Sequence, residues 1–277
     1  MINWVDLILN LAALLLWLNW RAGKVDPLGR RTPATLVGTL RRAEPSQIQR
    51  WQMPLILGGI IFLRAVLYWL IGSALGWVGT LNFGVISPAF RCSWFGPTLC
   101  FSFLSFLLVL GIFYSWMILL SLLEGPKPIH DFVRLQLGRV DDWPRGVKAC
   151  LPFVVTAVSW WLVSWMLVGL RIIPPPVTAL WRVEESLIIA AQSYLIWKFP
   201  AALLLVLHLL NSYIYFGRYP VWNYADKTAQ KLLQPLKGIP MRIGKVDFAP
   251  VLGIVLVFLI AEPAGRGLQW LYNRLSS

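Results

Sequence analysis

The stretch that decides the fold is residues 213–259, which read YIYFGRYPVWNYADKTAQKLLQPLKGIPMRIGKVDFAPVLGIVLVFL. It leaves one apolar run, crosses a basic segment that contains Pro235 and Pro240, and begins a second apolar run at Phe248. Apolar runs of about 20 residues are typical of membrane-spanning helices. The stretch is therefore interpreted as a link between two such helices, and weaker copies of the same plan lie upstream.

The composition of the whole chain agrees with this interpretation. Of its 277 residues, 58% are hydrophobic and 13% are charged, whereas a soluble domain carries about 25% charged residues. The apolar runs are continuous, which argues against the alternating strands of a membrane barrel. The sequence predicts an all-α membrane protein in which residues 1–277 form a single membrane domain.

We predict about six transmembrane helices. The apolar runs lie at 2–20, 53–78, 98–123, 150–170, 199–217 and 248–272. The first run is followed by Arg21 and preceded by no basic residue. A secretory signal has the reverse order of charge, so we expect a retained helix. The sixth run is expected to be interrupted at Glu262 and Pro263.

The distribution of basic residues predicts the orientation of these helices. Most of the 25 Lys and Arg residues lie in three connections, at 21–52, 124–148 and 218–247. The other connections carry Arg91 in one case and Arg171 with Arg182 in the other. Because short cytoplasmic loops are enriched in Lys and Arg, the three basic connections are predicted to be cytoplasmic and both termini to lie outside. This explains the net charge of +13 without a nucleic-acid partner.

The three basic links share one layout. Each has a short amphipathic stretch, a proline that ends it, and a second proline near the start of the next helix, where a missing N–H has no partner to lose. The amphipathic stretches are predicted at 33–44, 129–137 and 226–234, and the proline pairs are Pro45 with Pro54, Pro144 with Pro152, and Pro240 with Pro250. We therefore predict three repeated hairpins, at 1–78, 98–173 and 186–277, joined by amphipathic cytoplasmic links lying in the membrane interface. Asp226 is expected to be the N-cap of the third link.

The third link carries a family signal. Pro235, Lys237 and Pro240 are followed by Gly244, Asp247 and Pro250. This pattern resembles the YggT (YlmG) family, whose repeated membrane hairpins carry a proline–arginine–proline loop and then a G-x-x-D-x-x-P helix start. Here Lys237 stands in place of the usual arginine. The match covers the region 213–256, and the first two hairpins look like divergent copies that lack the Gly-x-x-Asp pair.

The resemblance implies a multi-pass protein of the bacterial inner membrane with no catalytic site and no cofactor. Bacterial members are linked to osmotic stress and to cell division or envelope organisation, and plastid relatives to assembly of a membrane cytochrome complex. The expected function is therefore that of a non-enzymatic organiser, accessory subunit or assembly factor. A channel or transporter for a small ion or solute is the alternative.

The third link is the predicted contact site. Anionic lipids and other integral membrane proteins are the expected partners, since each basic residue near a negative leaflet contributes about 1 kcal/mol, and a homo-oligomer is left open. The contact residues are Pro235, Lys237, Pro240, Arg242, Gly244, Lys245, Asp247 and Pro250. For Asp247, stabilisation of the helix dipole is favoured over partner contact.

Ionisable residues inside membrane runs are functional candidates by default. Arg64 lies in the second run, and Glu262 and Arg266 lie in the sixth. Three arrangements fit the sequence: an ion pair between Arg64 and Glu262, a local pair between Glu262 and Arg266, or an unpaired Glu262 at the outer surface. These structural roles are favoured over an ion or proton path.

The remaining reactive residues form no catalytic or metal-binding pattern. His130 and His208 have no flanking cluster at metal-ligand spacing, and we expect His208 to be packed or hydrogen-bonded. Cys92 and Cys100 are predicted to lie on the outer side, where an oxidising exterior would permit a disulfide between them. Cys150 lies on the reducing side. We expect no enzyme activity, cofactor or metal.

Overall fold

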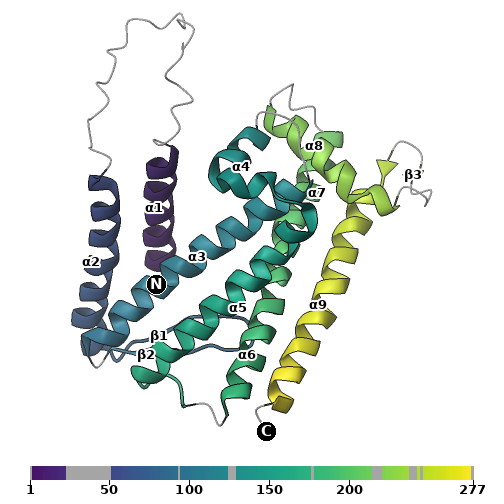
Figure 1. The fold of residues 1–277 in the computed structure, drawn as a ribbon. Coiled ribbons are helices and arrows are strands. Elements are labelled where there is room, and N and C mark those ends of the chain that lie inside the picture. The colour runs from purple at the N-terminus through teal and green to yellow at the C-terminus, as the bar shows by residue number, and fades with distance from the viewer. Residues whose placement is uncertain are drawn as a thin grey trace, which may run out of the picture. The chain divides into compact units, whose positions relative to one another are not determined.

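The computed structural model describes residues 2–22, 51–92, 94–123, 129–175, 178–213, 220–236, 242–243 and 246–275, which are mainly helical (Figure 1). The longer helices are α1 (Ile2–Ala22), α2 (Gln52–Leu75), α3 (Phe95–Leu123), α5 (Arg145–Gly169), α6 (Ala179–Gln192), α7 (Lys198–Tyr213) and α9 (Ala249–Leu275). Two shorter helices, α4 (Ile129–Leu137) and α8 (Pro220–Leu232), lie in the links. The 3-10 turns are η1 (Gly138–Asp142), η2 (Ser193–Trp197) and η3 (Gln234–Leu236). Two two-stranded sheets pair β1 (Val78–Thr80) with β2 (Ala89–Arg91) and β3 (Arg242–Ile243) with β4 (Val246–Asp247).

Five helical segments of the described chain are long and apolar enough to cross a membrane. They are α2, α3, α5, the continuous segment Leu180–Ser212 that includes most of α6, all of η2 and most of α7, and α9. The protein is therefore an all-α, multi-pass membrane protein. Helix α1 is not among the five. Asp6, Asn10 and Asn19 lie among its apolar residues. The predicted count of about six spans is thus supported for five.

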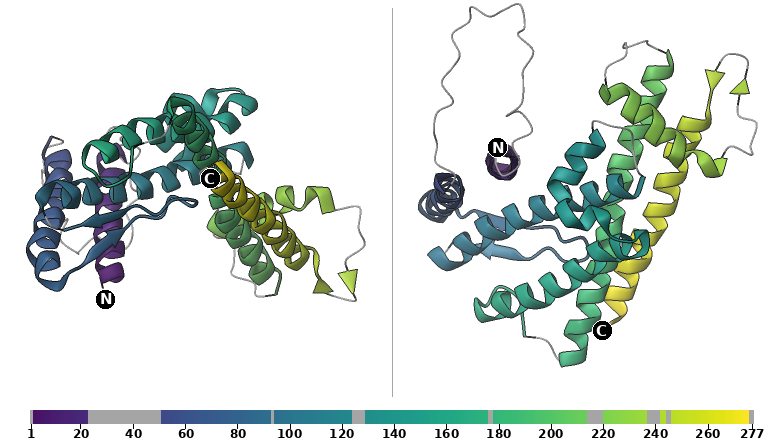
Figure 2. Two further views of the ribbon diagram at one scale, coloured as in Figure 1. Left: turned by 90° about the horizontal axis from the view of Figure 1, so that it is seen from below. Right: turned by 45° about the horizontal axis from the view of Figure 1, so that its top comes forward.

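The chain divides into two compact units, and the division falls inside α3. One unit is Met1–Gly79 with Phe90–Leu110, and the other is Thr80–Ala89 with Gly111–Ser277. In the first unit, α1 packs along α2. In the second unit, α5 packs along α6 and α7 packs along α9 (Figures 1 and 2). The α5–α6 pair joins the predicted second and third hairpins, so the repeat of three hairpins stays a prediction.

The links at 129–137 and 226–234 are helical as predicted, but their apolar faces do not lie free. In α4, Val133 and Leu137 are buried against Met117 and Ile118 of α3. Each link helix thus packs on a membrane helix next to it in the sequence. The predicted first link, 33–44, lies outside the described residues.

Helix α8 follows the same plan in the third link. Tyr224 and Ala225 are buried against Leu204 of α7. The helix begins at Pro220, six residues before Asp226, so the prediction that Asp226 is the N-cap is wrong. The reason is that proline is favoured in the first turn of a helix, and α8 can therefore begin earlier than the polar residues suggested.

The predicted positions of the link prolines are confirmed in two cases and corrected in one. Pro54 and Pro250 lie in the first turns of α2 and α9, as predicted. Pro152 is instead one turn further inside α5, because the extended backbone of Pro144 places the helix start at Arg145. Pro45 and Pro240 lie outside the described residues.

Helix α9 passes through Glu262 and Pro263 without a break, so the predicted interruption is wrong. A proline inside a membrane helix is tolerated because local adjustment and neighbouring groups satisfy the freed carbonyl. The helix continues for a further three turns, to Leu275.

The tip of the connection between α2 and α3, residues 80–89, belongs to the second unit and contacts its helices. The backbone N–H of Val85 donates to Gln192 Oε1 at 2.8 Å, and the ring of Phe83 lies 4.9 Å from that of Trp160 in α5. Gln192 is the last residue of α6, directly before η2. The tip therefore contacts the point at which the long Leu180–Ser212 segment changes from α to 3-10 geometry.

Candidate functional site

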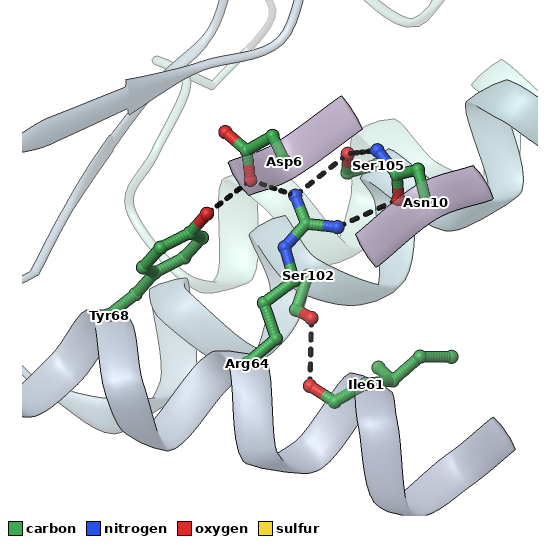
Figure 3. Close-up of polar contacts among 7 residues, drawn as sticks. All are labelled: Asp6, Asn10, Ile61, Arg64, Tyr68, Ser102 and Ser105. Atoms are coloured by element: carbon green, nitrogen blue, oxygen red, sulfur yellow. Dashed lines mark hydrogen bonds and ion pairs between the residues drawn. The ribbon is translucent and has the colours of Figure 1, made fainter. Parts of the chain in front are cut away.

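Among the described residues of the first unit, the most completely buried charge is Arg64 of α2, whose side chain is 3% exposed. Its guanidinium donates to Asp6 at 2.6 Å, to Asn10 at 2.8 Å and to Ser105 at 3.0 Å (Figure 3). Tyr68 also donates its hydroxyl to Asp6. We refer to Asp6, Asn10, Arg64, Tyr68 and Ser105 as the Arg64 cluster.

Helical spacing assembles this cluster from three elements. Asp6 and Asn10 are four residues apart on α1, and Arg64 and Tyr68 are four apart on α2, so each pair lies on one helix face. Ser105 comes from α3 and also accepts a hydrogen bond from Asn10 at 2.9 Å. One turn earlier on α3, Ser102 donates to the carbonyl of Ile61 at 2.8 Å (Figure 3). Polar contacts therefore join α1, α2 and α3.

The surroundings of Arg64 compensate for its burial. A charge removed from water costs several kcal/mol unless it is paired and hydrogen-bonded, and Asp6 supplies the opposite charge. The ring of Phe101 lies 5.3 Å from the guanidinium carbon, at a distance at which an aromatic face attracts a cation. In this part of the described chain only Arg64 Nε has no hydrogen-bond partner. The polar groups of the cluster thus bind one another and hold the three helices together, and they leave no vacant ligand site.

A gap between α1 and α2 also fails to provide a ligand site. It is lined by Leu16, Trp17, Trp20, Met53, Pro54 and Leu57. Its volume is about 10 Å³, which is the space of about one water molecule, and its apolar walls offer that water no partners.

The predicted pairing of Arg64 with Glu262 is wrong, because Arg64 is neutralised by Asp6 within its own unit. The carboxylate of Glu262 lies 3.4 Å from Lys198 Nζ, and its side chain is 55% exposed. No ion pair joins Glu262 to Arg266 in the described chain. The sequence signal that could have identified Asp6 is its spacing of four residues from Asn10 within an apolar run.

A second buried polar cluster lies at the end of α3 and was not predicted. Lys148 Nζ donates to Ser121 Oγ at 3.0 Å and to the carbonyl of Asp141 at 3.1 Å. Ser121 donates to Asp141 Oδ1 at 2.5 Å, and His130 Nε2 lies 3.6 Å from Asp141 Oδ2. Serine beside lysine can serve as a nucleophile and its base, but Ser121 has no exposed surface and gives its proton to Asp141. The cluster therefore fastens η1 to α3 and α5.

The third link is fastened to α7 in a comparable way. His208 Nδ1 lies 2.5 Å from Asp226 Oδ1, and Gln230 donates to Asp226 Oδ2 at 3.1 Å. The prediction that His208 is hydrogen-bonded is confirmed. Burial against Leu204 of α7 raises the pKa of Tyr224 in α8. Two further charged residues, Arg182 and Glu185, are buried in α6, and the Arg182 guanidinium carbon lies 4.3 Å from the centre of the Trp165 ring.

The residues of the family motif are only partly described. Pro235 lies in η3 and is exposed, whereas Pro250 is buried at the start of α9. The backbones of Arg242 and Asp247 pair across the antiparallel β3–β4 sheet. The other four predicted contact residues, Lys237, Pro240, Gly244 and Lys245, lie outside the described residues.

Cys92 and Cys100 are buried free thiols, so the predicted disulfide is not formed in the structure. The packing of Cys92 gives a reason. Its sulfur lies so near Gly72 of α2 that a Cβ at that glycine would approach it to 3.0 Å. Burial also raises the pKa of the Cys92 thiol. In the described residues, no group of three or more His, Cys, Asp and Glu side chains is placed to hold a metal ion.

Comparison with known proteins adds no relative: no family model, no curated protein and no solved structure matches this chain. The resemblance to the YggT family therefore gains no support from these comparisons.

Proposed function

We propose that this chain is a non-enzymatic membrane protein that organises or helps to assemble membrane protein complexes in a bacterial inner membrane. The observation that carries the proposal is the docking of the two described link helices. Because α4 and α8 bury their apolar faces on α3 and α7, their polar faces point away from the helices on which they pack. Arg134 of α4 and Lys227 of α8 are exposed, as is Arg139 of η1, which directly follows α4.

A helix that is packed on the protein holds its charged side chains at fixed positions, unlike a helix that lies in the bilayer interface. The contacts of Asp226 with His208 and of Asp141 with Ser121 fix both links to membrane helices. The basic side chains are thereby held at fixed positions at the predicted cytoplasmic surface. Such a surface suits acidic segments of partner proteins and the headgroups of anionic lipids.

The way in which the buried charges are paired within the protein favours this function over transport. Arg64 and Lys148 are each surrounded by acceptors in closed clusters. A solute path needs polar groups that can exchange partners, whereas the terminal guanidinium nitrogens of Arg64 and the Lys148 amine are already paired within the protein. Six spans and two outer termini are part of the same proposal, with α1 as the sixth span held by the Arg64 cluster.

The test is affinity purification from native membranes, followed by identification of bound proteins and lipids. We expect the double variant Lys227→Glu with Arg139→Glu to lose at least tenfold of the co-purified proteins and anionic lipid. Arg274→Glu, which reverses an exposed charge at the end of α9, is the matched control and should retain them.

Unchanged co-purification in the double variant would refute the role of the links. Reconstituted vesicles provide the second measurement. An ion or solute flux that disappears when Arg64 is replaced would instead establish transport.

A further inference from the structure

Helix α9 is the least buried of the five candidate spans, and its exposed side chains form a continuous stripe. One face packs on the rest of the second unit, with Pro250, Gly253 and Ala261 buried. Among the exposed residues of α9 are Val251, Val255, Leu259, Glu262, Arg266 and Trp270. These six residues, which recur at intervals of three or four and thus share one helix face, are called the α9 stripe.

The two charges in the stripe are in an unusual place. Ionisable residues of membrane helices nearly always face the interior of the bundle or a water-filled cavity. Glu262 and Arg266 instead lie on the outward face of α9, in line with apolar side chains that suit lipid. A rise of 1.5 Å per residue puts Glu262 about 20 Å from the start of the helix, inside a hydrocarbon core of about 30 Å.

The contacts within the chain leave these charges largely open. Lys198 approaches one oxygen of Glu262 at 3.4 Å, and more than half of the Glu262 side chain stays exposed. Arg266 forms no ion pair with any described residue and is exposed. Glu262 is thus paired on one side with Lys198 of α7. Together with Arg266 it still presents opposite charges, four residues apart, on the exposed surface of α9.

We propose that the α9 stripe is the interface of a homodimer, in which each Arg266 pairs with the partner subunit's Glu262. Both copies keep the same orientation in the bilayer if the twofold axis lies along the membrane normal. A twofold axis makes the interface self-complementary, so the same ion pair forms twice. The two residues are four positions apart, about 6 Å along the helix, which an arginine side chain can span.

The residues beside the α9 stripe leave room for a second helix to approach closely. Pro263 and Gly267 flank the charged residues, and the space around a Cβ added at Gly267 is open. Small residues beside a helix interface let two backbones approach closely. A second copy would give Arg266 an acidic partner and Glu262 a second basic one, whereas lipid chains would leave Glu262 with Lys198 alone and give Arg266 no ionic partner. The inference does not depend on the proposed organising function.

The test is the mass of the reconstituted full chain in lipid nanodiscs of stated composition, measured by light scattering or native mass spectrometry. We expect a dimer for the natural sequence. Glu262→Arg and Arg266→Glu each place like charges together and should weaken dimerisation at least tenfold. The exchanged double variant, Glu262→Arg with Arg266→Glu, should restore the dimer. A monomeric natural protein, or dimers unaffected by the single changes, would overturn the proposal.

A cross-linking experiment covers the case in which a charge variant fails to fold. In a Cys150→Ser background, Leu259→Cys should form an intersubunit disulfide when membranes are oxidised. Leu203→Cys on α7 is the matched control, because Leu203 is also a lipid-exposed leucine, at 54% compared with 63% for Leu259. Equal cross-linking at the two positions would contradict the proposed interface.

Discussion

Arg64 illustrates how much a single buried charge requires of its surroundings. It uses Asp6 and Asn10 from α1 and Ser105 from α3. Removal of one partner leaves the other buried without compensation, which is more costly than loss of both. The Arg64 cluster therefore holds α1 to α2 and α3.

We predict that Asp6→Asn lowers the free energy of unfolding by about 3–5 kcal/mol, the usual cost of breaking a buried ion pair. The double variant Asp6→Leu with Arg64→Leu should recover most of that loss, because it leaves no unpaired charge. Denaturation in mixed micelles measures the free energy of unfolding of both variants. A double variant less stable than Asp6→Asn alone would show that the cluster contributes mainly through its hydrogen bonds.

The three cysteines provide a second prediction at the residue scale. In the folded protein only Cys150 is exposed, while Cys92 and Cys100 are buried and free. A maleimide should therefore label one thiol per native chain. Without reductant, denaturation should make all three reactive. A single reactive thiol after denaturation would indicate the disulfide that the sequence permitted.

At the scale of elements, the tip of the α2–α3 connection depends on Gly84. Its φ of +93° lies in a region that side-chain-bearing residues rarely adopt, and an added Cβ would come within 2.2 Å of the Gln192 side chain. The close approach allows Val85 to bond to Gln192 next to η2. A 3-10 stretch within a longer helix often marks a hinge, so the tip contacts the part of the Leu180–Ser212 segment with the weaker helical geometry.

Gly84→Ala is expected to destabilise the protein by about 1–3 kcal/mol, since it adds backbone strain to the clash with Gln192. Gly138→Ala is the matched control. Gly138 also has a positive φ, +60°, but has no atoms near the new Cβ, so the expected loss is about 1 kcal/mol. Thermal unfolding compares the two variants. Equal losses would show that the contact with Gln192 contributes little.

For the whole molecule, the number of spans decides where the termini lie. The hydropathy of the described helices supports five spans, whereas an inserted α1 makes six. The Arg64 cluster links Asp6 of α1 to the interior of α2 and α3, which favours insertion. The predicted cytoplasmic location of the basic first connection agrees with insertion of α1.

Reporter fusions test the topology directly. With six spans, reporters at the N-terminus and the C-terminus should both be active on the outer side. With five spans, the two reporters should lie on opposite sides. We expect the first result, and we expect Asp6→Leu with Arg64 unchanged to reduce the outer location of the N-terminus, because Arg64 then has no ionic partner.

The sequence by itself determined the class of the protein and the positions of its long helices. Continuous apolar runs specify membrane helices regardless of their neighbours, since backbone groups in lipid must be satisfied within the helix. Runs two, three, four and six therefore appear within a few residues of their predicted ranges. The helical links at 129–137 and 226–234 followed from amphipathic spacing, which is also a local property.

The tertiary structure decided which polar side chains meet. Nothing in the spacing along the chain indicates that Asp6 reaches Arg64, or that Lys148 reaches Ser121, because these contacts join residues from different helices. For the same reason, Glu262 and Arg266 could be recognised as charges in a membrane run, but only the packing of α9 placed them on its outward stripe. A helix has a local cause, whereas the partner of a buried charge depends on how the helices pack.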